Sequence, residues 1–234
     1  MKSTQVVACV AMLAAATAAW ASPTVYNQPA IPGACSGSCW TSSVASSGNG
    51  FQAFDNFTLT QSSLIDGAHW QGFYWDFQNP AANPVSPTTT SWNISIWSDV
   101  SNAPGAQLFS QTVGVGSVTA TFLGLDTFGG SPVPVYDFSV SLTPFLAQVG
   151  TNYWFSPLSI QNTFDPIFSW SPGVGGDGSS WQRQLPGAGG SSKAGDRGFS
   201  LTGVAAVAVP EPATLGLLSL GLAGVGFVKR KRKI

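Results

Sequence analysis

Hydrophobic and polar residues alternate over short runs through most of the chain, between two continuous apolar runs near its ends. The short runs are rich in β-branched and aromatic residues and lack a sustained 3.6-residue period, a pattern that predicts strands. The nine expected strands are 51–60, 63–75, 91–98, 106–113, 119–125, 133–142, 151–160, 167–170 and 199–203. Nine short strands predict two packed sheets, that is, an all-β antiparallel β-sandwich.

The segments between these strands complete the layout of one expected domain. Residues 79–90 are a Pro/Thr-rich loop, 102–105 a turn and 171–198 a Gly/Ser-rich loop. We expect the sandwich domain to span residues 22–203, followed by a linker at 204–209.

The first apolar run predicts a signal peptide at residues 1–21. Lys2 precedes 14 apolar residues, and Ala19-Trp20-Ala21 has the small-x-small form that signal peptidase requires. We expect cleavage before Ser22. A buried helix and lipoprotein processing at Cys9 are the alternatives, although most of the apolar run follows Cys9.

The C-terminal run has three parts. Val209-Pro210-Glu211-Pro212 precedes 16 apolar residues, 213–228, and the basic run 229–233 follows. A helix of that length rises about 24 Å, and flanking Lys and Arg side chains can reach the interfaces of a bilayer core roughly 30 Å thick. The basic run favours a cytoplasmic C-terminus and leaves Pro-Glu-Pro at the outer membrane surface. The sequence therefore predicts a transmembrane helix over 213–228, either removed by processing or kept as a tail anchor.

This arrangement at residues 210–234, with Val209 before it, resembles the PEP-CTERM sorting signal of Gram-negative bacteria. The resemblance implies that exosortase, a membrane cysteine protease-transpeptidase, recognises Val209, Pro210, Glu211 and Pro212. It then implies removal of the tail and transfer of the ectodomain to the cell surface or extracellular matrix. The implied partners are signal peptidase, exosortase and, transiently, the inner membrane. Proteins with this signal are typical of bacteria that make exopolysaccharide and biofilm.

Two further resemblances imply no particular activity for this chain. The same tail has been labelled an ice-binding-protein C-terminal domain, but the short, isolated groups of Thr in this chain do not form the long flat arrays that ice binding requires. Segments 55–59, 70–75 and 94–97, followed by Ala103-Pro104-Gly105, resemble jelly-roll-like ectodomains often found with this signal. That similarity implies a fold and no particular activity.

The distribution of charge excludes a nucleic-acid binder. Asp, Glu, Lys and Arg make up 8% of the chain, and five of the nine Lys and Arg residues lie at 229–233. Between the terminal segments, Arg183, Lys193 and Arg197 stand against nine Asp, a formal charge of −6. A nucleic-acid-binding domain would carry a basic patch there. The 15 Phe, 9 Trp and 4 Tyr also argue against a disordered chain.

Loss of the signal peptide would leave two cysteines, Cys35 and Cys39. In the oxidising environment outside the cytoplasm this pair predicts a local disulfide. A metal site would need two further ligands, and a thioredoxin-like pair normally has two intervening residues rather than three.

Few residues suit catalysis. His69 is the only histidine, and no Gly-x-Ser-x-Gly is present. The nine Asp leave open a glycosidase-like hydrolase with two facing carboxylates, although Asp beside Gly or Asn usually forms turns. Asp177 and Asp196 could donate oxygens to calcium, but no EF-hand spacing accompanies them. We expect no enzyme activity, no cofactor and no metal site, with calcium at 171–198 left open.

The aromatic residues suggest a ligand-binding face. Strand alternation directs Ile96 and Phe155 inward, and it directs Trp97, Asp99 and Trp154 outward. An outward indole beside Asn, Ser or Asp can stack on a sugar ring while the polar groups bind its hydroxyls. Coverage of these rings by loops is the alternative.

Together these features predict an exported, exosortase-processed protein of the cell surface or matrix. We expect it to be non-catalytic, with exopolysaccharide as its candidate ligand. The alternative is a secreted glycosidase-like hydrolase that uses Asp carboxylates.

Overall fold

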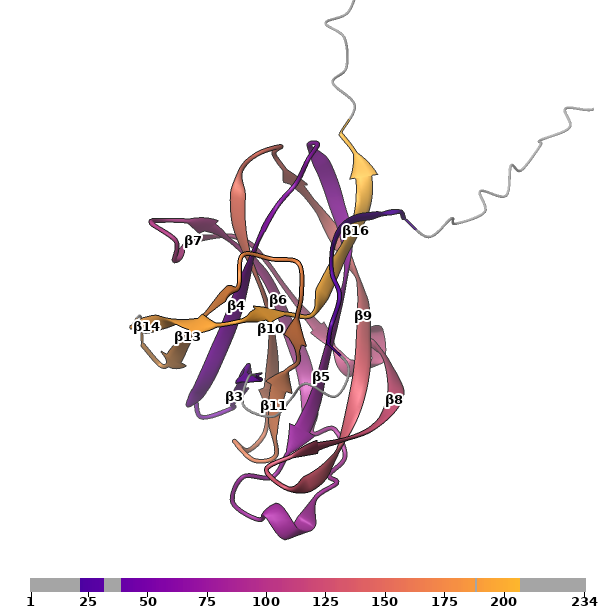
Figure 1. Cartoon of the computed structure of the whole chain (residues 1–234), viewed down its shortest axis with the longest axis vertical. Coiled ribbons are helices and arrows are strands. Elements are labelled where there is room, and N and C mark those ends of the chain that lie inside the picture. The colour runs from indigo at the N-terminus through magenta and orange to yellow at the C-terminus, as the bar shows by residue number, and fades with distance from the viewer. Residues whose placement is uncertain (1–21, 32–38, 188, 207–234) are drawn as a thin grey trace, which may run out of the picture.

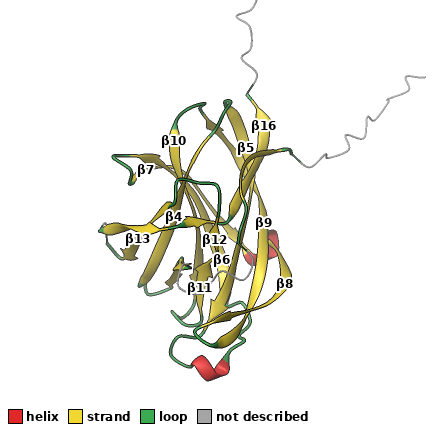
Figure 2. Ribbon diagram, in the orientation of Figure 1, coloured by secondary structure: helices red, strands yellow, loops and turns green. Residues whose placement is uncertain are grey.

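The computed structural model describes residues 22–31, 39–187 and 189–206, and these residues form an all-β domain (Figures 1 and 2). Its elements are β1 (Thr24–Gln28), β2 (Trp40–Thr41), β3 (Ser43–Ala45), β4 (Gly50–Thr58), β5 (Ser63–Trp75), η1 (Pro80–Ala82), β6 (Thr89–Asp99), β7 (Pro104–Gly114), η2 (Val115–Ser117), β8 (Thr119–Phe128), β9 (Ser131–Ala147), β10 (Asn152–Gln161), β11 (Ile167–Trp170), β12 (Pro172–Gly173), β13 (Ser179–Leu185), β14 (Gly190–Ala194), β15 (Asp196–Arg197) and β16 (Phe199–Ala205).

The strands form two large sheets, each seven-stranded within the described residues. In the first sheet the order is β1-β16-β5-β11-β2, and β9 pairs with both β5 and β8. In the second the order is β14-β13-β4-β3-β10-β6-β7, with β4 also paired to β10. All pairings are antiparallel except that of β3 with β10, so the second sheet is mixed. The short pair β12–β15 joins segments near the C-terminal strand.

Aromatic rings from both sheets fill the space between them. Trp70 and Phe138 come from the first sheet, as does Phe168 on β11, and Trp92 comes from β6 in the second. The ring of Trp92 lies 4.9 Å from Trp70, 5.0 Å from Phe138 and 4.8 Å from Phe168, measured between centroids. These separations are typical of favourable aromatic pairs, so the rings hold the two sheets together.

All nine strands expected from the hydrophobic pattern are present, with ends shifted by a few residues. The Gly/Ser-rich segment 171–198, expected to be a loop, differs. It contains the hairpin of β13 and β14, and β13 pairs with β4 from Ser180 to Leu185. The polar sequence of this hairpin gives no strand signal, and it is ordered by pairing with β4 at the sheet edge.

The described chain begins and ends at the same end of the sandwich (Figure 1). There β1 pairs with β16, and Ser63 at the start of β5 pairs with Ala205. At the opposite end of β5, Trp75 pairs with Ile167 of β11. The signal peptide and the helix expected at 213–228 lie outside the described residues. Within the described part of the chain, no helix has the length and apolar character needed to cross a membrane.

Candidate functional site

The three residues proposed from sequence as ligand contacts meet on the outer face of the second sheet. Trp97 of β6 and Trp154 of β10 are directly paired across the strands. The indole Nε1 of Trp154 donates a hydrogen bond of 2.7 Å to Oδ1 of Asp99. Ile96 and Phe155, one residue away on each strand, are in the core, as alternation predicts.

Exposure on this face differs from the expectation. Trp154 is only 1% exposed, although it projects away from the inter-sheet core, whereas Trp97 and Asp99 are half-buried. Alternation assigns a side chain to a face, but burial on that face depends on neighbouring strands. Trp154 therefore offers no open ring surface in this conformation.

Arg183 covers part of the same face. Its guanidinium carbon lies 4.6 Å from the ring centroid of Trp97 and 5.2 Å from that of Phe54. Phe54 in turn meets the Trp97 ring edge-on at 5.6 Å. Burial lowers the pKa of Arg183, and its guanidinium donates to Oε1 of Gln52 at 2.6 Å. Sequence reasoning missed Arg183 because it lies on β13, in the segment expected to be a loop.

Polar side chains under the aromatic rings are linked to one another. Trp97 Nε1 donates to Oγ of Ser95 at 2.9 Å, and Gln52 Nε2 donates to Oγ of Ser156 at 3.0 Å. Ser156 donates onward to the carbonyl of Ala53 at 2.7 Å. These bonds satisfy buried polar groups, so this face is a packed aromatic and polar layer with Trp97, Asp99 and Arg183 at its surface.

A second polar cluster is buried between β1, β4 and β15. Asp55 is fully buried and accepts hydrogen bonds from Nε2 of Gln28 at 2.5 Å, from the amide of Arg197 and from the amide of Asn56. Burial raises the pKa of the Asp55 carboxyl well above its usual value, and the hydrogen bonds from the amides of Arg197 and Asn56 act in the opposite direction. Burial, followed by the charge of Asp55, raises the pKa of Tyr26. The cluster ties three strands together.

The two Asp residues considered for calcium are engaged with backbone amides. Asp196 accepts from the amides of Gly176 and Gly178 at 3.0 and 2.7 Å. Asp177 accepts from the amide of Ser179 at 2.9 Å and from Asn56 Nδ2 at 2.7 Å. In the described ranges, no three His, Cys, Asp or Glu side chains lie close enough together to share a metal ion.

His69 lies in a polar groove of about 610 Å³ on the outer face of the first sheet. Its neighbours across the sheet are Ser139 and Ser200. Burial raises the pKa of Asp137 nearby, while a hydrogen bond from Gln71 and the proximity of His69 lower it. The groove gathers hydroxyl, imidazole and carboxylate groups that sequence reasoning did not combine, since register between β5, β9 and β16 brings them together.

The other predicted site residues fall at the limits of the described chain. Cys39 is disulfide-bonded, and its expected partner Cys35 lies outside the described residues, so that pairing stays a prediction. Ser22, expected to follow the signal cleavage site, is the first described residue, and Ala19 and Ala21 are not among the described residues. Residues 209–212 also fall outside.

Comparison with known proteins identifies the C-terminal segment. Residues 208–233 match the PEP-CTERM protein-sorting motif. No curated protein and no solved structure matches the chain.

Proposed function

We propose that this chain, which carries a PEP-CTERM sorting motif and is therefore exported and processed by exosortase, is a non-catalytic protein of the biofilm matrix of a Gram-negative bacterium. Its sandwich is of the jelly-roll-like kind, and exopolysaccharide is its ligand. Signal peptidase and exosortase act on it in turn, and the inner membrane holds it only between these two steps.

The position of the motif carries the proposal. The matched segment starts at residue 208, three residues after the last strand, β16, ends at Ala205. A protease at the membrane surface could therefore cut at Pro210 to Pro212 without unfolding the sandwich.

The use of the Asp residues supports a non-catalytic role. Seven Asp carboxylates accept hydrogen bonds from backbone amides. In five of them the amide lies one to three residues further along the chain, as is typical of residues that shape turns; these are Asp55, Asp76, Asp99, Asp126 and Asp177. Asp165 and Asp196 accept from the amides of Phe77 and Gly178 in distant segments. Hydrolysis of the cells' own polysaccharide by the purified protein would contradict this part of the proposal.

Mass spectrometry of the cell-surface protein tests the sorting step. We expect the mature C-terminus near Pro210 to Pro212 and the basic tail 229–233 to be absent. Glu211→Ala should leave the tail in place, whereas Lys193→Ala, a change in the folded domain, should be processed normally. An intact tail on the surface form of the unmodified protein would refute processing.

Affinity electrophoresis in gels that contain the native exopolysaccharide tests the ligand. We expect the exported protein to be retarded. Trp97→Ala tests the contact proposed from sequence, since Trp97 and Asp99 keep part of their surface open while Trp154 is buried. Migration identical with and without the polysaccharide would remove glycan binding and leave the sorting conclusion intact.

A further inference from the structure

Aliphatic side chains are exposed on the outer face of the first sheet, at the end where the chain leaves β16. Leu64 of β5 is paired with Leu146 of β9 on one side and with Val204 of β16 on the other. The three side chains form a row across the sheet and are 37%, 44% and 45% exposed, respectively. Their neighbours Ile65 and Ala147 belong to the core, so alternation places the row on the opposite face.

A fourth aliphatic side chain lies at the same end. Val149, in the turn between β9 and β10, is 54% exposed, and its amide donates to Oγ of Ser62 at 3.1 Å. The carbonyl of Ser62 accepts from the amide of Ala206, the last described residue, at 2.8 Å. We call these four side chains the exit patch: Leu64, Leu146, Val149 and Val204. Single exposed apolar residues are normal, but four around one chain exit indicate a contact surface.

The exit patch is aliphatic and carries no charge. Segments 58–65, 143–153 and 199–206, which contain it, have no Asp, Glu, Lys or Arg. The next charged residue along β5 is Asp66, whose carboxylate accepts from Oγ of Ser22 at 2.6 Å and from Oγ1 of Thr202 at 3.4 Å. The patch contains no aromatic ring on which a sugar could stack. Its chemistry therefore favours an apolar partner rather than a glycan.

The length of chain beyond the patch limits which partner can face it. The sorting motif matches residues 208–233, and the sequence predicts a membrane helix from residue 213. At about 3.3–3.6 Å per residue, the chain from residue 206 to residue 213 spans at most about 25 Å. The 13 residues of β5 alone extend further, roughly 40 Å. A membrane-inserted tail therefore keeps this end of the sandwich within reach of the bilayer.

We propose that the exit patch contacts the lipid bilayer and that this contact depends on the attached C-terminal tail. The inference rests on the transient membrane step of the function proposed above and adds the surface through which the domain meets the membrane. Four partly exposed aliphatic side chains are too few to hold a free protein there, since even one myristoyl chain gives only marginal binding. A short tether raises the effective concentration of the patch at the bilayer to about the millimolar range, so the weak contact persists in the tailed protein.

The test uses the chain after signal removal, residues 22–234, reconstituted at one copy per nanodisc of phosphatidylcholine. A nitroxide on Val204→Cys reports collisions with a water-soluble nickel complex and with oxygen, which concentrates in lipid. Labelling without reducing agent preserves the disulfide of Cys39. The reference is the tail-free chain that ends at Pro212, which keeps every described residue, mixed with the same nanodiscs.

We expect the nickel collision rate to be severalfold lower, and the oxygen collision rate higher, in the tailed chain than in the tail-free chain. Because the patch segments contain no Lys or Arg, nanodiscs with added phosphatidylglycerol should give the same result. Leu64→Gln combined with Leu146→Gln removes the two leucines beside the label. This pair should raise the nickel collision rate of the tailed chain towards that of the tail-free chain.

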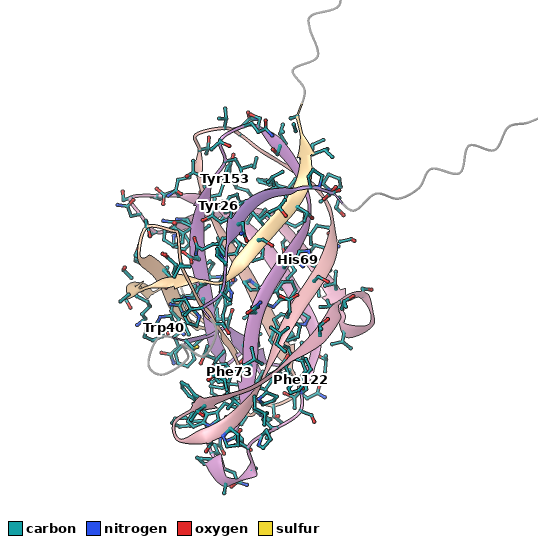
Figure 3. All side chains as sticks on the ribbon, turned by 45° about the vertical axis from the view of Figure 1, so that its right-hand side comes forward. Tyr26, Trp40, His69, Phe73, Phe122 and Tyr153 are labelled. Atoms are coloured by element: carbon teal, nitrogen blue, oxygen red, sulfur yellow. The ribbon has the colours of Figure 1, made fainter. Side chains whose placement is uncertain are left out.

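Leu123→Gln combined with Leu125→Gln is the matched control on β8. These leucines are 52% and 63% exposed, but Leu125 pairs with Pro134 near the start of β9, whereas Leu146 is near its end. In Figure 3, β16 leaves the domain at the top, and Phe122 of β8 is labelled in the lower half. The control pair should leave the label protected, and an unchanged thermal midpoint shows that both double variants remain folded.

Several outcomes would overturn the proposal. A label equally open to the nickel complex in the tailed and tail-free chains would exclude contact with lipid, while retention of the tailed chain by the nanodiscs would still support the membrane step. Protection seen only with anionic lipid, only with added exosortase or only with two copies per disc would assign the patch to a different partner. Protection that persists in the tail-free chain would remove the dependence on the tail. Failure of the tailed chain to enter nanodiscs would contradict the membrane step itself and the inference with it.

Discussion

The indole of Trp154 donates a 2.7 Å hydrogen bond to the carboxylate of Asp99, which links the third residue of β10 to the last residue of β6. The other carboxylate oxygen of Asp99 accepts from the amide of Asn102 at 3.4 Å. Ser101 and Asn102 both have left-handed backbone conformations, with φ of 55° and 59°. One carboxylate therefore joins a buried ring to the turn between β6 and β7.

Trp154→Phe should separate the hydrogen bond from the packing of the ring. We expect it to lower the free energy of unfolding by about 1 kcal/mol, because Asp99 is half-buried and water can replace the indole. Trp154→Ala should cost about 3–5 kcal/mol through loss of a buried aromatic side chain. Urea denaturation measures both. If Asp99→Ala and Trp154→Phe prove additive in the double variant, the hydrogen bond does not contribute to stability.

The buried cluster around Asp55 should be more sensitive than any surface carboxylate. Asp55→Ala would remove the acceptor of one N–H of the Gln28 side-chain amide, whose other bond goes to the carbonyl of Arg197, and the acceptor of the backbone N–H of Arg197. At about 1–3 kcal/mol for each unsatisfied buried donor, we expect a loss of about 3 kcal/mol or more. Asp126→Ala is the control, since that carboxylate accepts a surface bond from Thr127 and its loss should stay within about 0.5 kcal/mol. Equal losses for the two variants would contradict a special role for Asp55.

The same burial predicts an unusual dependence of stability on pH. The pKa values of Asp55 and Asp137 are raised in the folded protein, chiefly by burial. A carboxyl with a raised pKa binds its proton more tightly when folded, so its contribution to stability is complete below the unfolded pKa of about 3.9 and is lost as pH rises through the folded pKa. We expect the free energy of unfolding to increase as the pH is lowered from 7 towards about 4.

Asp137→Asn isolates one of these groups. Its amide does not titrate, so the increase in stability on acidification should be smaller than in the unmodified protein. Guanidinium denaturation at a series of pH values measures the slope. If the free energy of unfolding instead falls as the pH is lowered from 7 to 5, the two raised pKa values do not dominate the pH dependence of stability.

Gly72 tests how tightly the sheets pack. It faces the core from β5, where a Cβ atom would overlap the ring of Phe168 and lie 2.5 Å from the carbonyl oxygen of Ser169. We expect Gly72→Ala to cost about 1–3 kcal/mol through overpacking and to lower the thermal midpoint. Gly114→Ala is the matched control on β7, since a Cβ there meets no atom within 4 Å. A thermal midpoint that is unchanged in both variants would show that the core around Phe168 rearranges to accommodate the added methyl group.

The sequence was sufficient for the main strands because burial between two sheets requires apolar residues at alternate positions. For β6, alternation alone predicts that Ile96 is inside and Trp97 outside, and the structure agrees. The hairpin β13–β14 could not be predicted, since its polar residues form strands through the pairing of β13 with β4 and of β14 with β13. Missing that hairpin also concealed Arg183, which stacks on Trp97.

The meeting of aromatic residues near the end of β5 could not be predicted from the sequence either. Trp40, Trp75 and Phe164 are far apart in the chain and meet because β2 and β5 both pair with β11, which follows Phe164 closely. A local pattern records which residues share a strand face, but not which strand ends meet at one end of a sandwich. The clustering of aromatic residues in 73–77 is the one local sign of this end.

Strand β5 runs the length of the sandwich, from Ser63 beside Ala205 at the chain exit to Trp75 beside Ile167. At about 3.3 Å per residue, this strand separates the two by roughly 40 Å. If the domain is held through the chain that leaves β16, the aromatic residues around Trp75 therefore lie at the end of β5 farthest from that exit.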